Sequence, residues 1–170
     1  AGNSIESGGN YNTVVGDEAG TALTTGDGNV AVGFEALKTE DANGESTAIG
    51  YQALKTQNAG ISGLNVAVGY KAGAAVTTGT INTLIGALAG DALTTGNSNV
   101  AVGHTALSAD TLGDRNVAIG NNALAQQNFT SSTDSYNVAI GYVAGGSVTT
   151  GVQNTLIGGL AGDAITTGNY

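Results

Sequence analysis

The sequence predicts an all-β parallel β-solenoid of about nine 17-residue coils. Three observations predict it: a five-residue motif recurs nine times, its closing glycines are almost evenly spaced, and large β-branched residues alternate with small ones inside it. A stretch of this length holds about two short strands and two turns, so it cannot bury its own apolar face. Coils stacked about 4.8 Å apart would bury a continuous core, in a rod of roughly 40–45 Å.

The motif reads Asn-Val-Ala-Val-Gly or a close variant. It occurs at 29–33, 65–69, 99–103, 116–120 and 137–141, and in relaxed form at 12–16, 46–50, 82–86 and 154–158. Successive closing glycines are 17, 17, 19, 17, 17, 17, 21 and 17 residues apart. A second period of about 70 residues divides the repeat domain 10–170 into the blocks 10–79, 80–151 and 152–170, after a lead-in of 1–9. We therefore expect a single repeat domain.

Each position of the motif has a structural reason. Strand side chains alternate, so Val30 and Val32 point one way and Ala31 the other. The closing Gly supplies positive φ or close backbone approach at a corner that every coil turns alike. The leading Asn is expected to form a ladder whose side-chain amides hydrogen-bond from coil to coil, and Ser46 interrupts that ladder once.

Composition excludes several functional classes. The chain of 170 residues has 13 acidic residues, only four Lys and Arg, and a formal charge of −9, which argues against binding to nucleic acid or anionic membranes. No run is long enough to cross a membrane, so this segment is not expected to insert. We find no combination of nucleophile, base and orienting group, and no zinc or calcium motif. The expectation is a protein that is not an enzyme and has no cofactor, no metal site and, because Cys is absent, no disulfide.

The motif at 116–120, Asn-Val-Ala-Ile-Gly, resembles the head repeat of YadA-like trimeric autotransporter adhesins, although it lacks the Ser of that family's Asn-Ser-Val-Ala-Ile-Gly. The Thr-Thr-Gly punctuation is also similar to repeats of phage tail-fibre shafts. The resemblance covers roughly residues 10–168. It implies a left-handed β-roll, a homotrimer, a location on the cell or virion surface, and attachment to a host surface. The coils are longer than that family's usual head repeat, and its neck, stalk and membrane anchor have no counterpart in this sequence.

The small face of the strands suggests where copies associate. Residues at the Ala position are small in most coils, and a large residue replaces Ala once in each block. The predicted trimer axis is lined by this position: Val14, Ala31, Ala67, Leu84, Ala101, Ala118 and Leu156. The alternative is that this face is packed by another strand of the same coil. An end-to-end filament of stacked solenoids is the second hypothesis for assembly.

An aromatic row follows the motif glycines. Its members are Phe34, Tyr51, Tyr70, His104 and Tyr142. We interpret the row as a ladder packed from coil to coil, with stacking on sugar rings as the alternative. His104 is the chain's one histidine, which is too little for a triad or a zinc site.

Recognition is predicted in two long connections, 55–64 and 126–136. They lie at equivalent points of the two blocks, where the glycine spacing exceeds 17. Extra residues in a solenoid bulge into solvent, and such insertions often bind partners. The candidate residues are Gln57, Asn58, Gln127, Asn128, Phe129, Asp134 and Tyr136, and the candidate partner is a host-surface glycan or protein. The alternative is that these loops vary without function and that Phe129 packs against a neighbouring coil.

Two further patterns receive simpler interpretations. The acidic residues around positions 40 and 110 are interpreted as solvated loop charge. Thr-Thr-Gly recurs, beginning at Thr24, Thr77, Thr94, Thr149 and Thr166, and threonine ranks raise ice binding as a third functional class. Ice binding needs an uninterrupted flat array, which the coils carrying Lys-Thr-Glu at 38–40 and Ser-Ala-Asp at 108–110 interrupt.

Overall fold

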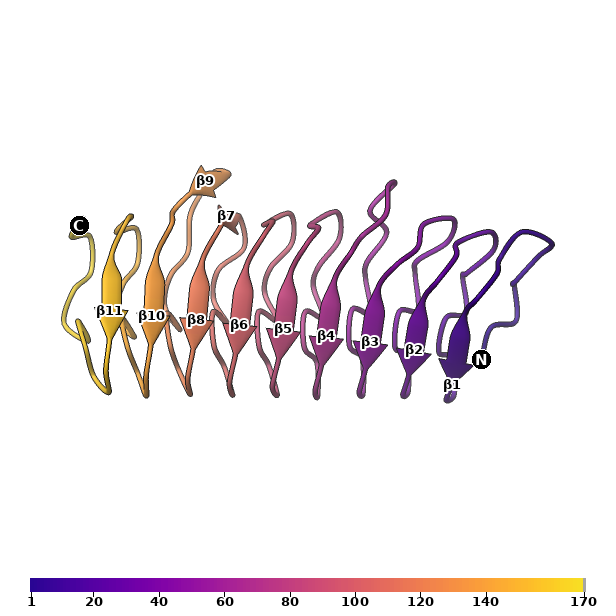
Figure 1. Ribbon diagram of the computed structural model, residues 1–170, viewed down its shortest axis with the longest axis horizontal. Helices are drawn as coiled ribbons and strands as arrows, with labels where there is room; N and C mark the ends of the chain where they lie inside the picture. The colour runs from indigo at the N-terminus through magenta and orange to yellow at the C-terminus, as the bar shows by residue number, and fades with distance from the viewer. Residues whose placement is uncertain (170) are drawn as a thin grey trace.

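The structure is a parallel β-solenoid of about nine turns, as the repeat predicts (Figure 1). It is a computed structural model that describes residues 1–169, and within them no helix occurs. Tyr170, the last residue of the expected third block, lies outside the described residues. The all-β fold class is confirmed.

Short strands stack in chain order along the rod. The elements are β1 (Thr13–Val15), β2 (Val30–Val32), β3 (Thr47–Ile49), β4 (Val66–Val68), β5 (Thr83–Ile85), β6 (Val100–Val102), β7 (Gly113–Asp114), β8 (Val117–Ile119), β9 (Thr133–Asp134), β10 (Val138–Ile140) and β11 (Thr155–Ile157). One nine-stranded sheet has the order β1-β2-β3-β4-β5-β6-β8-β10-β11, and β7 pairs with β9 in a second sheet. Every pairing is parallel, and those of the nine-stranded sheet join the same motif positions, as Leu84 with Ala101.

The motif glycine is required by close backbone stacking. Gly103 has a φ of +138°, which L side chains rarely adopt. A Cβ built there would lie 2.5 Å from the carbonyl oxygen of Gly120 in the next coil. Because that neighbour is backbone, no side chain can move aside, so the repeat needs Gly at this corner.

The predicted Asn ladder lies inside the solenoid. The Asn99 backbone N–H donates to Oδ1 of Asn82 at 3.0 Å, and the Asn116 N–H donates to Oδ1 of Asn99 at 2.9 Å. The same side chain also closes its own coil, since Asn82 Nδ2 donates to the Gly96 carbonyl at 2.9 Å. Ser46 keeps the contact in weakened form, accepting from the Asn65 N–H at 3.4 Å. Each Asn side chain therefore satisfies buried backbone groups in two directions.

Two kinds of coil fill the core. The fourth residue after the motif glycine has positive φ, and it is Gly90 in one coil and Leu107 in the next, each with φ near +54°. Where it is Gly, an aliphatic side chain three residues later, Leu93, fills the interior. Where it is Leu, the residue three positions later is polar and buried, as Asp110 is. The two large groups thus exchange places between coil types, and the interior stays filled.

The lead-in continues the stacking. The Gly2 N–H donates to the Ala19 carbonyl at 2.9 Å, and the Glu6 N–H donates to the Thr24 carbonyl at 3.0 Å. The lead-in therefore lies against the first coil through main-chain hydrogen bonds.

Candidate functional site

The nine-stranded sheet presents a flat face to the outside of the solenoid. We call it the outer sheet face and define it by the first and third residue of each strand: Thr13, Val15, Val30, Val32, Thr47, Ile49, Val66, Val68, Thr83, Ile85, Val100, Val102, Val117, Ile119, Val138, Ile140, Thr155 and Ile157. All eighteen are Val, Ile or Thr, and none is charged. All are half-buried or exposed, Ile85 to 39%. The result is two columns of β-branched side chains running the length of the rod.

In two coils an exposed aliphatic residue adjoins this face, whereas the same position holds Glu45 and Arg115 in other coils. Leu64 and Ile81 stand two residues before β4 and β5, and both are exposed. Their coils are adjacent, because the Ile81 N–H donates to the Gly63 carbonyl. The outer sheet face is therefore the candidate interaction surface, because large exposed apolar patches are typical of such sites.

The predicted trimer axis was placed on the wrong face. Ala31, Ala67, Leu84, Ala101 and Ala118 are fully buried within a single chain, and Val14 and Leu156 pack against the same core. The interior is narrow, so most strands carry Ala at this position, and Leu84 fits where the neighbouring coil walls carry Gly73 and Gly90. The alternative stated for this face, packing within the same coil, is what the structure shows.

The aromatic row forms a ladder over three coils. Phe34 stacks on Tyr51 with ring centroids 5.2 Å apart, and Tyr51 stacks on Tyr70 at 5.4 Å. The rings are partly exposed, and their coils are joined by main-chain hydrogen bonds. His104 and Tyr142 lie in the same column but outside the ladder, because Ala87 and Asn121 fill the intervening places.

A charged network lies beside the ladder. Glu35 accepts from Lys38 at 2.6 Å, from Lys55 at 2.6 Å and from Gln52 at 2.6 Å. Lys38 also reaches Glu18 at 2.5 Å in the preceding coil. The hydrogen bond from Lys38, with those from Lys55 and Gln52, lowers the pKa of Glu35 to about 2. These pairs hold three consecutive coils together on the outside.

In the first long connection, Gln57 is a structural residue. It is fully buried, and its Nε2 donates to Glu40 Oε2 at 2.8 Å and to Ser46 Oγ at 2.9 Å. Its Oε1 accepts from Asn65 Nδ2 at 2.8 Å, so it fills the gap that Ser46 leaves in the Asn ladder. The prediction that Gln57 binds a ligand is wrong because solvent cannot reach it. Asn58 is exposed, as its candidacy requires.

The second long connection also contains both buried and exposed candidate residues. Gln127 is fully buried, donating to Asp110 at 2.6 Å and accepting from Asn137 at 2.7 Å. Phe129 is only 6% exposed, which agrees with the alternative that it packs against the protein. Neither is available to a ligand, and that part of the prediction is corrected. Asn128, Asp134 and Tyr136 are exposed.

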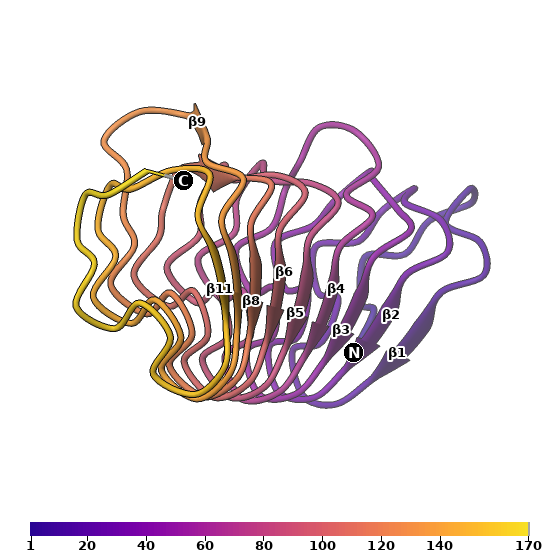
Figure 2. The same ribbon diagram turned by 60° about the vertical axis from the view of Figure 1, so that its left-hand side comes forward.

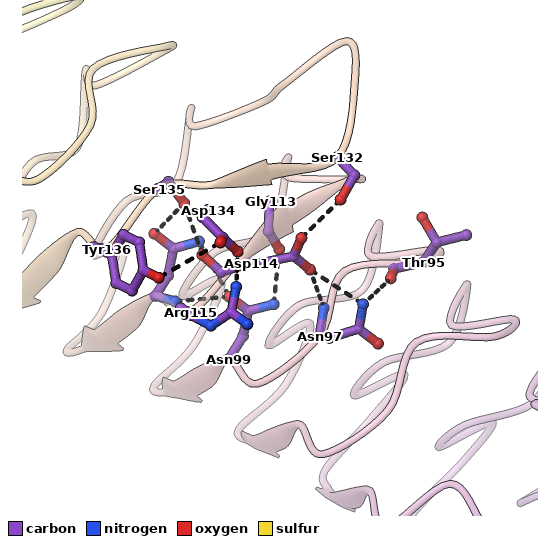
Figure 3. A network of polar contacts seen from close by, with 11 residues as sticks. Thr95, Asn97, Asn99, Gly113, Asp114, Arg115, Ser132, Asp134, Ser135 and Tyr136 are labelled. Atoms are coloured by element: carbon purple, nitrogen blue, oxygen red, sulfur yellow. Dashed lines mark hydrogen bonds and ion pairs between the residues drawn. The ribbon is translucent and has the colours of Figure 1, made fainter. Parts of the chain in front are cut away.

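The second loop is held rigidly by polar contacts (Figure 3). Asp114 accepts from Ser132 Oγ at 2.8 Å and from the Asn97 N–H at 2.6 Å. Arg115 pairs with Asp134, and its guanidinium lies 5.7 Å from the centroid of the Tyr136 ring. Strands β7 and β9 add a short parallel pairing. In Figure 2 this loop projects from the rod, and so does the long connection between β3 and β4.

Buried acids are a feature that sequence reasoning missed. Glu40 and Asp110 are fully buried, and Asp114 nearly so, although they were interpreted as solvated loop charge. Burial raises the pKa of the Asp110 carboxyl. Each of the fully buried acids ends a directional chain in which an Asn donates to a Gln and the Gln to the carboxylate. The signal was present, because in both blocks an acid seven residues after a motif glycine precedes a Gln at the same place in the next coil.

The Thr-Thr-Gly hydroxyls are engaged within the solenoid. Oγ1 of Thr77 donates to the Thr94 carbonyl at 3.1 Å, and Oγ1 of Thr94 donates to the Thr111 carbonyl at 3.0 Å. Thr24 and Thr149 make the same contact with their next coils. These hydroxyls stabilise the stacking of coils, and this rank of threonines gives no support to ice binding.

Residues 1–169 contain no cluster of His, Cys, Asp and Glu that could hold a metal ion. Over the same range, no helix is long and apolar enough to span a membrane.

No protein-family description, curated protein or solved structure matches this chain.

Proposed function

We propose that this chain is a non-catalytic structural and adhesion module of an extracellular surface fibre, in which three copies pack through their outer sheet faces. The observation behind the proposal is the uncharged column pair of the outer sheet face, which runs along all nine strands. The resemblance of the motif to YadA-like adhesin heads and to tail-fibre shafts supports a surface location and a trimer. In this proposal the trimer axis is lined by the Val and Ile face instead of the Ala face.

The chemistry of this face favours another copy of itself as partner. Its repeat along the rod is the coil spacing, about 4.8 Å, and a second solenoid with the same repeat can match it along the whole length. A partner with a different repeat would lose register after a few coils. The absence of charge at all eighteen positions means that no charge on the face itself opposes close approach. Burial of the β-branched side chains supplies the driving force, at about 25 cal/mol per Å².

The formal charge is consistent with such an assembly. The chain carries −9, yet the outer sheet face carries none of it. The exposed acids lie elsewhere, so three copies would keep that charge on the outside, where it is solvated and screened, while Glu40 and Asp110 are buried within each chain. This arrangement favours a closed assembly that stays soluble.

The test is the mass in solution of the wild type and of two matched variants. We expect light scattering to give about 3 × 16.5 kDa for the wild type. Ile85→Glu places a charge at the middle of the outer sheet face, where the side chain is partly exposed in one chain, and should yield a folded monomer. Thr95→Glu adds the same charge at an exposed position outside the strands and should leave the trimer intact.

The alternative outcomes are distinguishable. A wild type that remains monomeric at high concentration overturns the proposal. A mass that grows continuously with concentration favours the end-to-end filament instead. A dimer would keep association through this face and reject the threefold arrangement.

A further inference from the structure

The second long connection holds the one Asn-x-Thr sequence of the chain. Asparagine occurs 17 times, and only Asn128 is followed two residues later by Thr or Ser, in Asn128-Phe129-Thr130. This tripeptide is the acceptor pattern for N-linked glycosylation, which modifies the Asn side chain in surface loops. A pattern of three residues arises easily by chance, so its use depends on the exposure and the conformation of the loop.

The three residues alternate between the outside and the inside of the protein. Asn128 and Thr130 are exposed, whereas Phe129 between them is only 6% exposed. None of the three has a positive φ. Alternation of this kind is typical of an extended chain, in which residues two apart point to the same side. The Asn amide and the Thr hydroxyl are therefore presented together on the surface, and the buried Phe129 ring anchors the segment.

The Asn128 side chain is held through its oxygen, and its nitrogen is free. Thr111 Oγ1 donates to Asn128 Oδ1 at 2.9 Å, and the Asn128 backbone N–H donates to the Thr149 carbonyl at 2.9 Å. No described residue accepts a hydrogen bond from Asn128 Nδ2. The ladder asparagines differ, since Asn137 is fully buried and its Nδ2 donates to the Gly151 carbonyl at 2.7 Å. Asn128 Nδ2 is thus accessible and costs no internal hydrogen bond to modify.

The position of Asn128 leaves the outer sheet face clear. Asn128 stands eight residues after the motif glycine Gly120 and nine before Asn137, so it lies about half a coil away from β8 and β10. The loop that contains it projects from the rod in Figure 2. A group attached to Asn128 is therefore compatible with copies that pack through their strands.

We propose that Asn128 is an N-glycosylation site, at which a saccharide is joined through its C1 to Asn128 Nδ2. The donor is a sugar activated as a glycosyl diphosphate on a lipid or nucleotide carrier. In the transfer the bond between C1 and the diphosphate oxygen breaks, and its electron pair leaves with the diphosphate. The bond from Nδ2 to C1 forms, and one Nδ2 proton goes to a base of the transferase, which reads the Thr130 hydroxyl. The modification goes beyond the proposed function and does not rest on the trimer.

Asn58 is a matched control within the same chain. It occupies the equivalent place in the first long connection, is exposed, and donates its backbone N–H to the Thr77 carbonyl at 2.9 Å, as Asn128 does to Thr149. Two residues later stands Gly60, which has no hydroxyl and a φ of +71°. Asn58 therefore shares the surface position of Asn128 and lacks the acceptor sequence, so it should stay unmodified.

The experiment is peptide mapping by mass spectrometry of the protein purified from the cells that produce it. Cleavage after Lys and Arg places Asn58 on the peptide 56–71 and Asn128 on the peptide 116–170. We expect added saccharide mass on the peptide 116–170, assigned to Asn128 by fragmentation that keeps the sugar attached, and none on the peptide 56–71. A single added sugar identifies a nucleotide carrier as donor, and a preassembled oligosaccharide identifies a lipid carrier.

Two variants made in the same cells test the sequence requirement. Thr130→Ala leaves Asn128 in place and should abolish the added mass, whereas Thr130→Ser keeps a hydroxyl and should retain it. Thr130 is exposed, so both should melt at the temperature of the unglycosylated wild type. A peptide 116–170 of unmodified mass in the wild type overturns the proposal, as does a saccharide that persists in Thr130→Ala or that occurs equally on Asn58. The mass of the assembly in solution does not enter this test, so the failure of either proposal leaves the other standing.

Discussion

Asn82→Ala probes the ladder at a fully buried position. Asn82 Oδ1 accepts from the Asn99 N–H at 3.0 Å and from Asn99 Nδ2 at 3.2 Å, and its Nδ2 donates to the Gly96 carbonyl at 2.9 Å. Asn82, Asn99 and Gly96 are all buried. The substitution therefore removes a side chain that serves backbone groups of two different coils.

The magnitude follows from what is left unpaired. Alanine leaves the Asn99 N–H and the Gly96 carbonyl without partners and away from water. Each unsatisfied buried group costs about 1–3 kcal/mol, so we expect the free energy of unfolding to fall by roughly 2–6 kcal/mol. That is a large part of the ~5–15 kcal/mol stability of a typical domain.

Asn12→Ala is the matched control at the end of the ladder. Its side chain makes the equivalent bonds, from the Asn29 N–H at 2.8 Å and to the Gly26 carbonyl at 2.7 Å. Asn12 is only half-buried, so water can replace part of what is lost, and we expect a cost near 1 kcal/mol. Urea unfolding followed by circular dichroism, at one protein concentration, measures both. Equal losses in the free energy of unfolding for the two variants would refute the reasoning, because burial would then not determine the cost of an unpaired group.

Two other predictions test the core and the charges. Ala101→Arg should prevent folding or strongly lower the melting temperature, because Ala101 is fully buried and a charge there has no partner or space; a folded, soluble monomer would instead restore the Ala face as an exterior surface. Glu35 has a pKa lowered from 4.5 to about 2, so its contribution to stability is present above pH 4.5 and is lost as the pH falls toward 2. Glu35→Gln should flatten the slope of stability against pH in that window, measured by urea titrations at several pH values, and an unchanged slope would assign the slope to other carboxylates.

The sequence predicted those features that depend on repetition. Regular spacing of the motif glycines predicts stacked coils, and a residue such as Gly103 is needed wherever two backbones approach closely at a positive φ. The Asn ladder follows from the same regularity, because identical residues at one coil position must lie above one another. Phe34, Tyr51 and Tyr70 stack for this reason.

Features that depend on residues found in only a few coils were not predictable in this way. Gln57 and Gln127 occur among polar loop residues, and their composition is that of a solvated loop. Their burial depends on a carboxylate from the preceding coil, Glu40 or Asp110, and on an Asn from the following one. Such a three-coil contact leaves no trace within one coil, because the partners are 8 to 17 residues apart, and it emerges only when equivalent positions of successive coils are compared.

The orientation of the strands is the clearest case in which the sequence pattern did not predict the packing. Alternation divides Val100, Ala101 and Val102 into two faces but does not say which face is inside, and the assignment of Ala to the outside assumed that small residues permit contact between copies. In the structure the interior is narrow, and Leu93 and Leu107 enter it from the other walls of neighbouring coils. Ala101 fits inside beside Leu107, whereas Leu84 takes the same position where Gly90 leaves more room. Val100 and Val102 are consequently outside, partly exposed, in columns of the same type on every strand. A single chain thus buries Ala101 and leaves Val100 and Val102 partly exposed, which is why the trimer proposed above uses the Val and Ile face.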